Sequence, residues 1–374
     1  MNKISFLLIV FISSQLFSQP PSLKNLGNTC YMNATIQALY NIPALNNLLL
    51  VNQTAFASDQ NSLGYLYINL IDKFNEKKYN PKFNINNLNT ALKKFATKTD
   101  EEIEKNDKVG GCAQHDSAEY LGLLLNNLQE LGGEPTKEGI NNICGIDSIS
   151  EIFCPTIPFI SETSEHQLYL TVNVTNVQGE VLKTLQDCLN EYFKKEQLDE
   201  FKPKDYDLQT NCTKQFLLEK TYDIFIINLK KYRRTLGGGI QKIDYPINIP
   251  FQLELKPFFK STIDKLTAYR LIGAIQQRGT AGGGHYVAYV REQELQKWFL
   301  CNDSSINEIS LPDLMRQLNT SYLFFYSQGE ATKQELEMQK KVPKPGIPIA
   351  APLSHSLDEL TQKLTNLSQE LQRN

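Results

Sequence analysis

Histidine is scarce in this chain of 374 residues, and closely spaced cysteines are absent. There are four histidines, and none of the seven cysteines forms a C-x-x-C pair with another. A strong charge of either sign is also missing, because the formal net charge is −3. The chain therefore lacks the basic footprint by which proteins bind nucleic acid, and we expect no nucleic-acid partner.

Apolar runs long enough to span a bilayer are absent beyond the N-terminus. There, residues 1–3 carry one positive charge, residues 4–17 are mostly apolar, and small and polar residues follow from Ser18. This pattern is typical of a secretory signal peptide over residues 1–18, with cleavage after Ser18. We predict a secreted protein with no membrane contact in its mature form. The alternatives are an uncleaved anchor, or a buried helix in a cytoplasmic protein.

A cysteine stands where a polar loop leads into a helix, in the stretch 23–33. Asn28 or Thr29 can cap the first turn, and apolar residues then recur at helical spacing until Pro43 ends the pattern. Cys30 therefore lies in the first turn, where unpaired N–H groups and the helix dipole favour its thiolate form. A thiolate attacks carbonyl groups. The alternative is a small thiol buried on the apolar face of the helix.

A nucleophilic cysteine needs a base, and His285 is the histidine with the most suitable surroundings. It follows three glycines, which allow close backbone approach, and it begins an alternating strand. A second strand over 298–301 ends at Asn302 and Asp303. If the two strands form a hairpin, Asn302 or Asp303 accepts a hydrogen bond from the imidazole and fixes its tautomer. Cys30 would then complete a Cys-His-Asn/Asp arrangement.

Five segments resemble, in order, the sequence boxes of the ubiquitin-specific proteases, which are papain-like deubiquitinating cysteine peptidases. They are residues 23–33, 114–121, 226–232, 282–290 and 321–326. The resemblance runs from residue 22 to residue 327 and implies a catalytic domain over 20–328. The implied fold is α+β, with a helical thumb, an antiparallel β palm and reduced fingers.

The resemblance also implies a role for each candidate catalytic residue. Cys30 attacks the carbonyl of the bond that follows a Gly-Gly tail, and His285 takes the thiol proton and later gives it to the leaving lysine amine. Asn302 orients His285, and Asp303 assists it or takes its place. Asn25 donates its side-chain N–H to the tetrahedral oxyanion.

Substrate contacts are implied for Asp116, Glu119, Gly283, Gly284 and Tyr286. Asp116 would contact a basic residue in the ubiquitin tail, and the glycines would keep the channel narrow. Asp116-x-x-Glu119 also fits a capping box, and the two roles can coexist. His115 stands where the family usually has glutamine, and we expect it to face solvent.

Family members often carry two C-x-x-C pairs that bind zinc in the fingers. This chain keeps only Cys154 and Cys212 near those places, so we predict no metal and no cofactor. In an exported protein six of the cysteines could form disulfides. We expect buried thiols instead, because the core is large.

The periodicity predicts elements for each part of this fold. Thumb helices are expected over 61–74, 81–97 and 113–131, and finger strands with one helix over 142–222. Palm strands are expected over 221–232, 243–255, 269–277, 285–291 and 298–301, with a glycine turn at 237–239.

The tail over 329–374 differs in composition from the domain. A charged helical stretch covers 330–341, a proline-rich linker follows, and leucines then recur at helical spacing over 356–372. This last helix is expected to dock on the domain or to pair with a partner helix.

We therefore predict a cysteine-type deubiquitinase with ubiquitin as its partner. The alternatives are a catalytically weak ubiquitin-binding module and a peptidase for another ubiquitin-like modifier. Asn33 and Asn302 lie in glycosylation sequons, where a glycan would obstruct the cleft. This argues against a eukaryotic secretory pathway and favours a bacterial protein exported to act on a eukaryotic host.

Overall fold

The computed structural model describes residues 19–79, 85–106, 115–234, 240–261, 267–280 and 283–341. The predicted signal peptide, the predicted turn at 237–239, Cys112 and the predicted helix over 356–372 lie outside these residues. Within the described part of the chain, each helix is too short or too polar to cross a bilayer.

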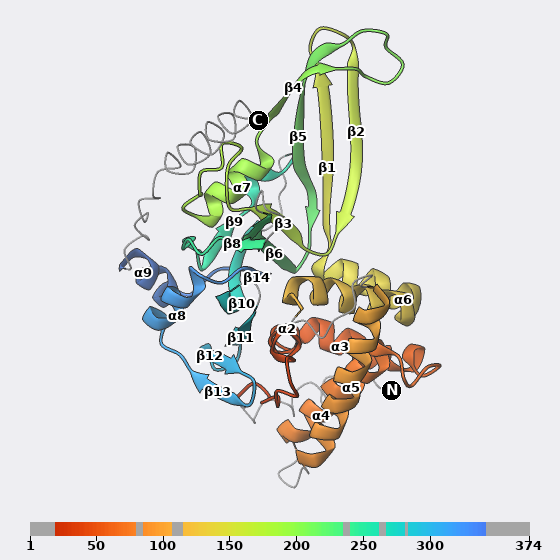
Figure 1. The fold of residues 1–374 in the computed structure, drawn as a ribbon, viewed down its shortest axis with the longest axis vertical. Helices are drawn as coiled ribbons and strands as arrows, with labels where there is room; N and C mark the ends of the chain where they lie inside the picture. Colours follow the sequence, from red (N-terminus) through yellow and green to blue (C-terminus); the bar gives the residue numbers. More distant parts are fainter. Residues whose placement is uncertain are drawn as a thin grey trace, which may run out of the picture.

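The elements form three groups (Figure 1). The thumb contains α2 (Cys30–Tyr40), α3 (Pro43–Val51), η1 (Gln53–Phe56), α4 (Leu63–Tyr79), α5 (Ile85–Asn106) and α6 (Ser117–Cys144). The fingers contain β1 (Ile146–Cys154), β2 (Phe159–Gln167), β4 (Glu196–Phe201) and β5 (Thr210–Thr221). The palm sheet contains β3 (Leu170–Asn173), β6 (Ile224–Lys230), β9 (Gln252–Glu254), β10 (Ala268–Thr280), β11 (Gly283–Glu292), β12 (Lys297–Asn302), β13 (Ser305–Glu308) and β14 (Leu323–Gln328).

The remaining elements flank the palm. They are α7 (Leu185–Phe193), η2 (Lys256–Phe258), α8 (Leu311–Leu318), α9 (Lys333–Lys341) and a small hairpin of β7 (Tyr232–Arg234) and β8 (Ile240–Lys242). Helix α2 lies between the other thumb helices and the palm and contacts β11 (Figure 1). The predicted α+β class is confirmed.

The helix that begins at Cys30 ends before Pro43, as predicted, since α2 stops at Tyr40. Pro43 then begins a separate helix, α3, because proline lacks an N–H and is well suited to the first helical position. Helix α6 continues past residue 131 to Cys144 and bends at Gly133, whose φ is 69°. The bend comes two residues before Pro135, which cannot continue a regular helix.

The palm sheet has the strand order β13-β12-β11-β10-β14-β6-β3, with β9 also paired to β10. β3 lies within 142–222, the range expected for the fingers, but it joins the palm sheet instead. All palm pairs are antiparallel, as predicted, except that of β3 with β6. Between these two strands the chain passes through α7, β4 and β5, and parallel neighbours require such a long crossover.

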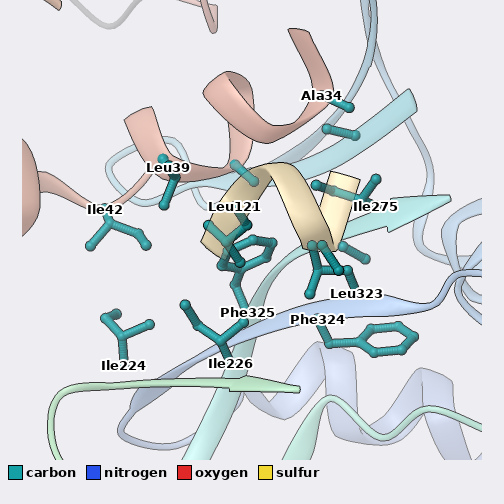
Figure 2. Close-up of a cluster of buried hydrophobic side chains, with 14 of the residues drawn as sticks. Ala34, Leu39, Ile42, Leu121, Ile224, Ile226, Ile275, Leu323, Phe324 and Phe325 are labelled. Atoms are coloured by element: carbon teal, nitrogen blue, oxygen red, sulfur yellow. The ribbon is translucent and has the colours of Figure 1, made fainter. Parts of the chain in front are cut away.

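An apolar core joins the thumb to the palm (Figure 2). Leu39 of α2 and Leu121 of α6 face Ile226, Ile275 and Phe325 of the sheet, and all five are buried. Each such side chain stabilises the fold by about 1.5–3 kcal/mol relative to exposure. The core therefore fixes α2, and with it Cys30, against the palm.

The fingers sheet has the order β2-β1-β5-β4 and extends away from the thumb and palm (Figure 1). Its register places Phe153 opposite Thr213, and the adjacent Cys154 and Cys212 form a disulfide. The expectation that these two cysteines are buried thiols is therefore wrong. Cys30, Cys144, Cys188 and Cys301 are buried thiols that lie outside the disulfide. Among the described residues, no three His, Cys, Asp or Glu side chains gather where a metal ion could bind.

The segment after β14 packs against the palm. The predicted charged helix is α9, and its Glu335 is only 4% exposed. Glu335 Oε1 accepts hydrogen bonds from Arg291 Nε at 2.9 Å and from Trp298 Nε1 at 3.1 Å. These two donors are cross-strand partners in β11 and β12. The fold thus continues to Lys341, past the expected boundary at residue 328.

Candidate active site

Cys30 is the first residue of α2 and is 2% exposed. Thr29 occupies the N-cap position, but its side chain does not cap the helix as predicted. Its φ and ψ of −89° and 10° are not the extended values from which a cap reaches the first turn. Instead its hydroxyl accepts from Leu26 N at 2.9 Å and donates to Asn25 Oδ1 at 3.3 Å.

Asn25 organises the loop before the cysteine. Its Oδ1 accepts from the backbone N–H groups of Gly27 at 3.0 Å and Thr29 at 3.3 Å. Between them the chain takes two left-handed residues, Gly27 with φ 98° and Asn28 with φ 47°. Glycine and asparagine adopt this conformation at least cost, which explains their presence here.

The predicted hairpin is present, since β11 and β12 pair antiparallel from Ala288 with Cys301 onward. It brings His285 Nε2 to 2.6 Å from Asn302 Oδ1. An amide oxygen only accepts, so Nε2 carries the hydrogen and Nδ1 is the basic nitrogen. The His285 side chain is 38% exposed, which leaves it accessible to solvent.

Asp303 connects the hairpin to the loop and to the helix. Its Oδ2 accepts from Asn25 Nδ2 at 2.9 Å and its Oδ1 from Asn33 Nδ2 at 2.7 Å. Oδ2 also lies 3.8 Å from His285 Nε2, and the side chain is 12% exposed. The backbone takes a left-handed φ of 51° here, which turns the carboxylate toward α2.

Asn33 is a site residue that the sequence pattern did not identify. It is 1% exposed, and its Nδ2 also donates to Lys24 O at 3.3 Å. Asn33 follows Cys30 by three residues and so lies on the same side of α2. The sequence does contain a signal for it, because Asn33 is a polar residue one helical turn after Cys30 on an otherwise apolar face. Because Asn33 is buried and hydrogen-bonded, its sequon is inaccessible in the folded chain.

Cys30 and the strand that carries His285 lie together, since α2 packs on β11. Burial raises the pKa of Tyr286, and the nearby Asp116, Tyr232 and Cys30 raise it further. Tyr286 is therefore surrounded by groups from the thumb, the β7–β8 hairpin and the nucleophile helix.

Asp116 is the N-cap of α6, as predicted. Its Oδ1 accepts from Ala118 N at 2.7 Å and Glu119 N at 3.2 Å. Burial raises the pKa of Asp116, and these two N–H groups lower it in part. Glu119 is exposed in the first turn of the helix. His115 does not face solvent as expected: it is half-buried, with its ring edge-on to Tyr31 at 5.6 Å.

The backbone approaches closely at the glycines before His285. Gly283 and Gly284 pair with Thr280 and Gly279 of β10. A Cβ on Gly284 would lie 2.3 Å from the Arg278 carbonyl oxygen, so no side chain fits there. This agrees with the close approach that the glycine run predicts.

The chain resembles known proteins over most of its length. The family model for ubiquitin carboxyl-terminal hydrolase matches residues 22–326. Ubiquitin carboxyl-terminal hydrolase 25 of Arabidopsis thaliana is 26% identical over 334 residues, which cover 83% of this chain and 47% of that protein. Ubiquitin carboxyl-terminal hydrolase 8 of Saccharomyces cerevisiae is 24% identical over 339 residues, with 82% of this chain and 70% of that protein covered.

The fold is also that of solved structures. In a SAGA DUB module bound to monoubiquitin, the Ubp8 chain superposes with a TM-score of 0.71 at 22% identity. The match covers 88% of this chain and 74% of that one. Against the Arabidopsis relative, this chain spans about half of the protein's length.

A cysteine at a helix start, beside a strand whose histidine is bonded to an asparagine, is the arrangement of a cysteine peptidase. The fold and the family match over residues 22–326 show which family of cysteine peptidases this is. The chain belongs to the ubiquitin carboxyl-terminal hydrolase family.

Proposed function

We propose that this chain hydrolyses the peptide or isopeptide bond that follows the C-terminal Gly-Gly of ubiquitin. One observation carries the proposal: the 2.6 Å contact between His285 Nε2 and Asn302 Oδ1, beside an Asp303 carboxylate that also holds Asn25 and Asn33. Family membership supports ubiquitin as the partner.

The acylation half of the reaction begins at the thiol. His285 Nδ1 takes the proton of Cys30, and Sγ attacks the carbonyl carbon of the terminal glycine. One N–H of the Asn25 amide is held by Asp303, and its second N–H is assigned to the tetrahedral oxyanion. When the intermediate collapses, His285 gives its proton to the leaving lysine amine. A thioester on Cys30 remains.

Deacylation uses the same groups in reverse. His285 takes a proton from water, and the hydroxide attacks the thioester carbonyl. Collapse releases the ubiquitin carboxylate and returns the proton to the thiolate of Cys30. Asn302 keeps the imidazole in one tautomer and orientation through both halves, without adding a charge.

The substrate tail would enter past Gly283 and Gly284, where only glycine can pass. Asp116, Glu119 and Tyr286 would contact the residues that precede Gly-Gly. The half-buried position of Asp116 supports a contact with a cation, because burial raises the pKa of this carboxyl and a positive partner favours its ionised form.

A ubiquitin with a C-terminal fluorogenic amide, and one with a vinyl sulfone, test the proposal. Wild-type protein is expected to release the fluorophore and to form a covalent adduct, and Cys30→Ala is expected to do neither. An adduct that survives in Cys30→Ala would contradict the assigned nucleophile. Binding without turnover would identify a ubiquitin-binding module. Turnover of only another modifier, in a panel of fluorogenic substrates, would change the substrate.

We also propose that the protein is exported by a bacterium and acts on a eukaryotic host. The pattern of residues 1–18 supports export, and so does the Cys154–Cys212 disulfide, since disulfides persist in oxidising compartments. N-terminal sequencing of protein from a secreting bacterium tests this, with Gln19 expected as the first residue. An intact Met1 on a soluble cytoplasmic product would count against export.

A further inference from the structure

One edge of β10 has two different partners along its length. β14 pairs with it as far as Ile275, whose carbonyl oxygen accepts from Tyr322 N at 3.0 Å. Carbonyl groups of alternate residues in a strand point to the same edge. The carbonyls of Gln277 and Gly279 therefore extend this row beyond the point where β14 begins.

Lys242, from β8, supplies donors to this uncovered part of the edge. Its Nζ donates to Gln277 O at 2.9 Å and to Gly279 O at 3.0 Å. It also forms an ion pair with Asp244 at 3.1 Å, and its side chain is 12% exposed. An ammonium group has three N–H donors, and these contacts account for all three. Lys242 thus supplies the hydrogen bonds that a neighbouring strand would otherwise donate to these two carbonyls.

The opposite edge of the same short segment carries the candidate site. Arg278 pairs with His285, Gly279 with Gly284, and Thr280 with Gly283. Lys242 therefore holds the three-residue end of β10 against which the general base and both glycines are paired.

The position of this segment sets the position of Gly284 directly. An added Cβ on Gly284 would lie 2.3 Å from Arg278 O and equally close to Gln277 Nε2. Gln277 Nε2 in turn donates to Thr280 O at 2.7 Å, which closes the end of the strand. A shift of β10 would therefore move the glycine backbone.

We propose that Lys242 is a positioning residue for substrate specificity: it fixes the end of β10 so that the Gly283–Gly284 backbone keeps the tail channel closed to side chains. The proposal rests on the proposed function, because it assigns these glycines to the ubiquitin tail. Without its ammonium, two backbone carbonyls lose charged donors, and the end of the hairpin gains freedom to move.

Lys242→Met tests this, because it keeps the length of the side chain and removes its donors. The measurement is kcat/KM for a ubiquitin amide and for the same substrate with alanine as its penultimate residue. Wild-type protein should strongly prefer glycine, and Lys242→Met should lower that preference about tenfold. Lys242→Arg, which can still donate to both carbonyls, should restore most of it. Lys297→Met is the matched control, since Lys297 pairs with Glu308 elsewhere in the same sheet and its side chain is 50% exposed.

A merely structural role would lower turnover of both substrates equally and leave the ratio unchanged, which would overturn the proposal. Rates are normalised to active enzyme by titration with the vinyl sulfone. If wild-type protein turns over no ubiquitin substrate, the proposed function fails. Hydrogen exchange of the backbone amides of residues 276–280 and 284–288 then tests separately whether Lys242 positions the end of β10. Faster exchange there in Lys242→Met, but not in Lys297→Met, supports a positioning role, and unchanged exchange contradicts it.

Discussion

The palm hairpin β11–β12 and the fingers sheet are both antiparallel, but they are stabilised in opposite ways. The palm is covered on both faces, with β10 buried from Leu271 to Gln277 between α2 and α8 (Figure 1). In the fingers, β2 is exposed or half-buried along its whole length, and Ile160 is 64% exposed. The palm is stabilised by buried apolar side chains and by the buried Arg291–Glu335 pair. The fingers have in addition a covalent link, the disulfide between β1 and β5.

This difference explains where the candidate chemistry lies. A catalytic histidine must be held to within a fraction of an ångström, and a strand in a well-packed sheet can provide that precision. The fingers, in contrast, extend away from the thumb and palm and leave β2 exposed or half-buried (Figure 1). We therefore expect damage to the palm to affect folding and catalysis, and damage to the fingers to remain local.

The largest effect is expected where the hairpin meets α9. Arg291 is 1% exposed, and among the described residues its Nη1 and Nη2 have no hydrogen-bond partner. Glu335→Ala would leave this guanidinium buried without its counter-ion, and the free energy of unfolding should fall by about 3–5 kcal/mol. Urea denaturation measures the loss.

The double variant Arg291→Met with Glu335→Leu is the control, since it removes both charges and refills the space. It should recover most of the lost stability, because apolar replacement of a buried pair is often neutral. Failure of the double variant to recover would show that packing, and not the unpaired charge, causes the loss.

The fingers are tested by replacing both members of the disulfide with serine. The Cys154–Cys212 link spans 58 residues, and its loss should lower the free energy of unfolding by about 2–4 kcal/mol. Amide exchange should rise in β1 and β5 and stay unchanged around His285 and Asn302. Reductant should have the same effect on wild-type protein and none on the double variant. Equal exchange changes in both sheets would remove the distinction between the two regions.

The same difference decides what could be predicted from the sequence. The hairpin of His285 and Asn302 could be predicted, because alternation and turn residues are local signals. The Cys154–Cys212 disulfide could not, since it depends on the register of two strands 58 residues apart. The contact of Glu335 with Arg291 and Trp298 could not be predicted, because a highly charged sequence is typical of a helix exposed to solvent.

The network around Asp303 was predicted in part. Asn25 and Asp303 could be named from the family boxes, but Asn33 was noted only as part of a sequon. Its partner lies 270 residues away, so the contact appears only once α2 packs against β11. Lys242 is similar, because nothing local shows that β14 leaves an edge of β10 uncovered.

At the catalytic end of the hairpin, Asn33→Asp should impair turnover with little loss of folded protein. It sets a second carboxylate at the position from which Asn33 Nδ2 donates to Asp303 over 2.7 Å. Repulsion between the two should separate α2 from the hairpin and lower kcat/KM about a hundredfold. Asn46→Asp is the control, because Asn46 is also buried and donates to Tyr40 O at 2.7 Å, away from the site.

Adding Asp303→Asn to Asn33→Asp reverses the donor and the acceptor. The amide oxygen at residue 303 can still accept from Asn25, while its nitrogen donates to the new carboxylate. Recovery of at least tenfold in kcat/KM is expected for the double variant. If the double variant is no better than Asn33→Asp, the contact with Asn33 does not position the helix.

The smallest effect concerns a buried charge in the palm, Lys231, which is 2% exposed. Its Nζ donates to Asn319 O at 3.2 Å, and among the described residues no buried carboxylate pairs with it as Glu335 pairs with Arg291. Burial, helped by the nearby Lys242 ammonium, lowers the pKa of Lys231 to about 7. Between pH 7 and the ordinary lysine pKa of 10.5, this lysine is protonated in the unfolded chain but neutral in the folded one. The free energy of unfolding therefore rises with pH over this range. Below pH 7 the full penalty remains.

Lys231→Met should therefore stabilise the protein, by about 2 kcal/mol at pH 6, and the gain should shrink toward zero near pH 10. Thermal or urea unfolding of both proteins at several pH values measures this difference, in which all other titrating groups cancel. Lys220→Met is a suitable control, since Lys220 is exposed on the fingers and its removal should change stability little at any pH. A gain that is the same at pH 6 and pH 10 would mean that the lysine is charged throughout. The palm would then tolerate an uncompensated cation, and the contrast with Arg291 would disappear.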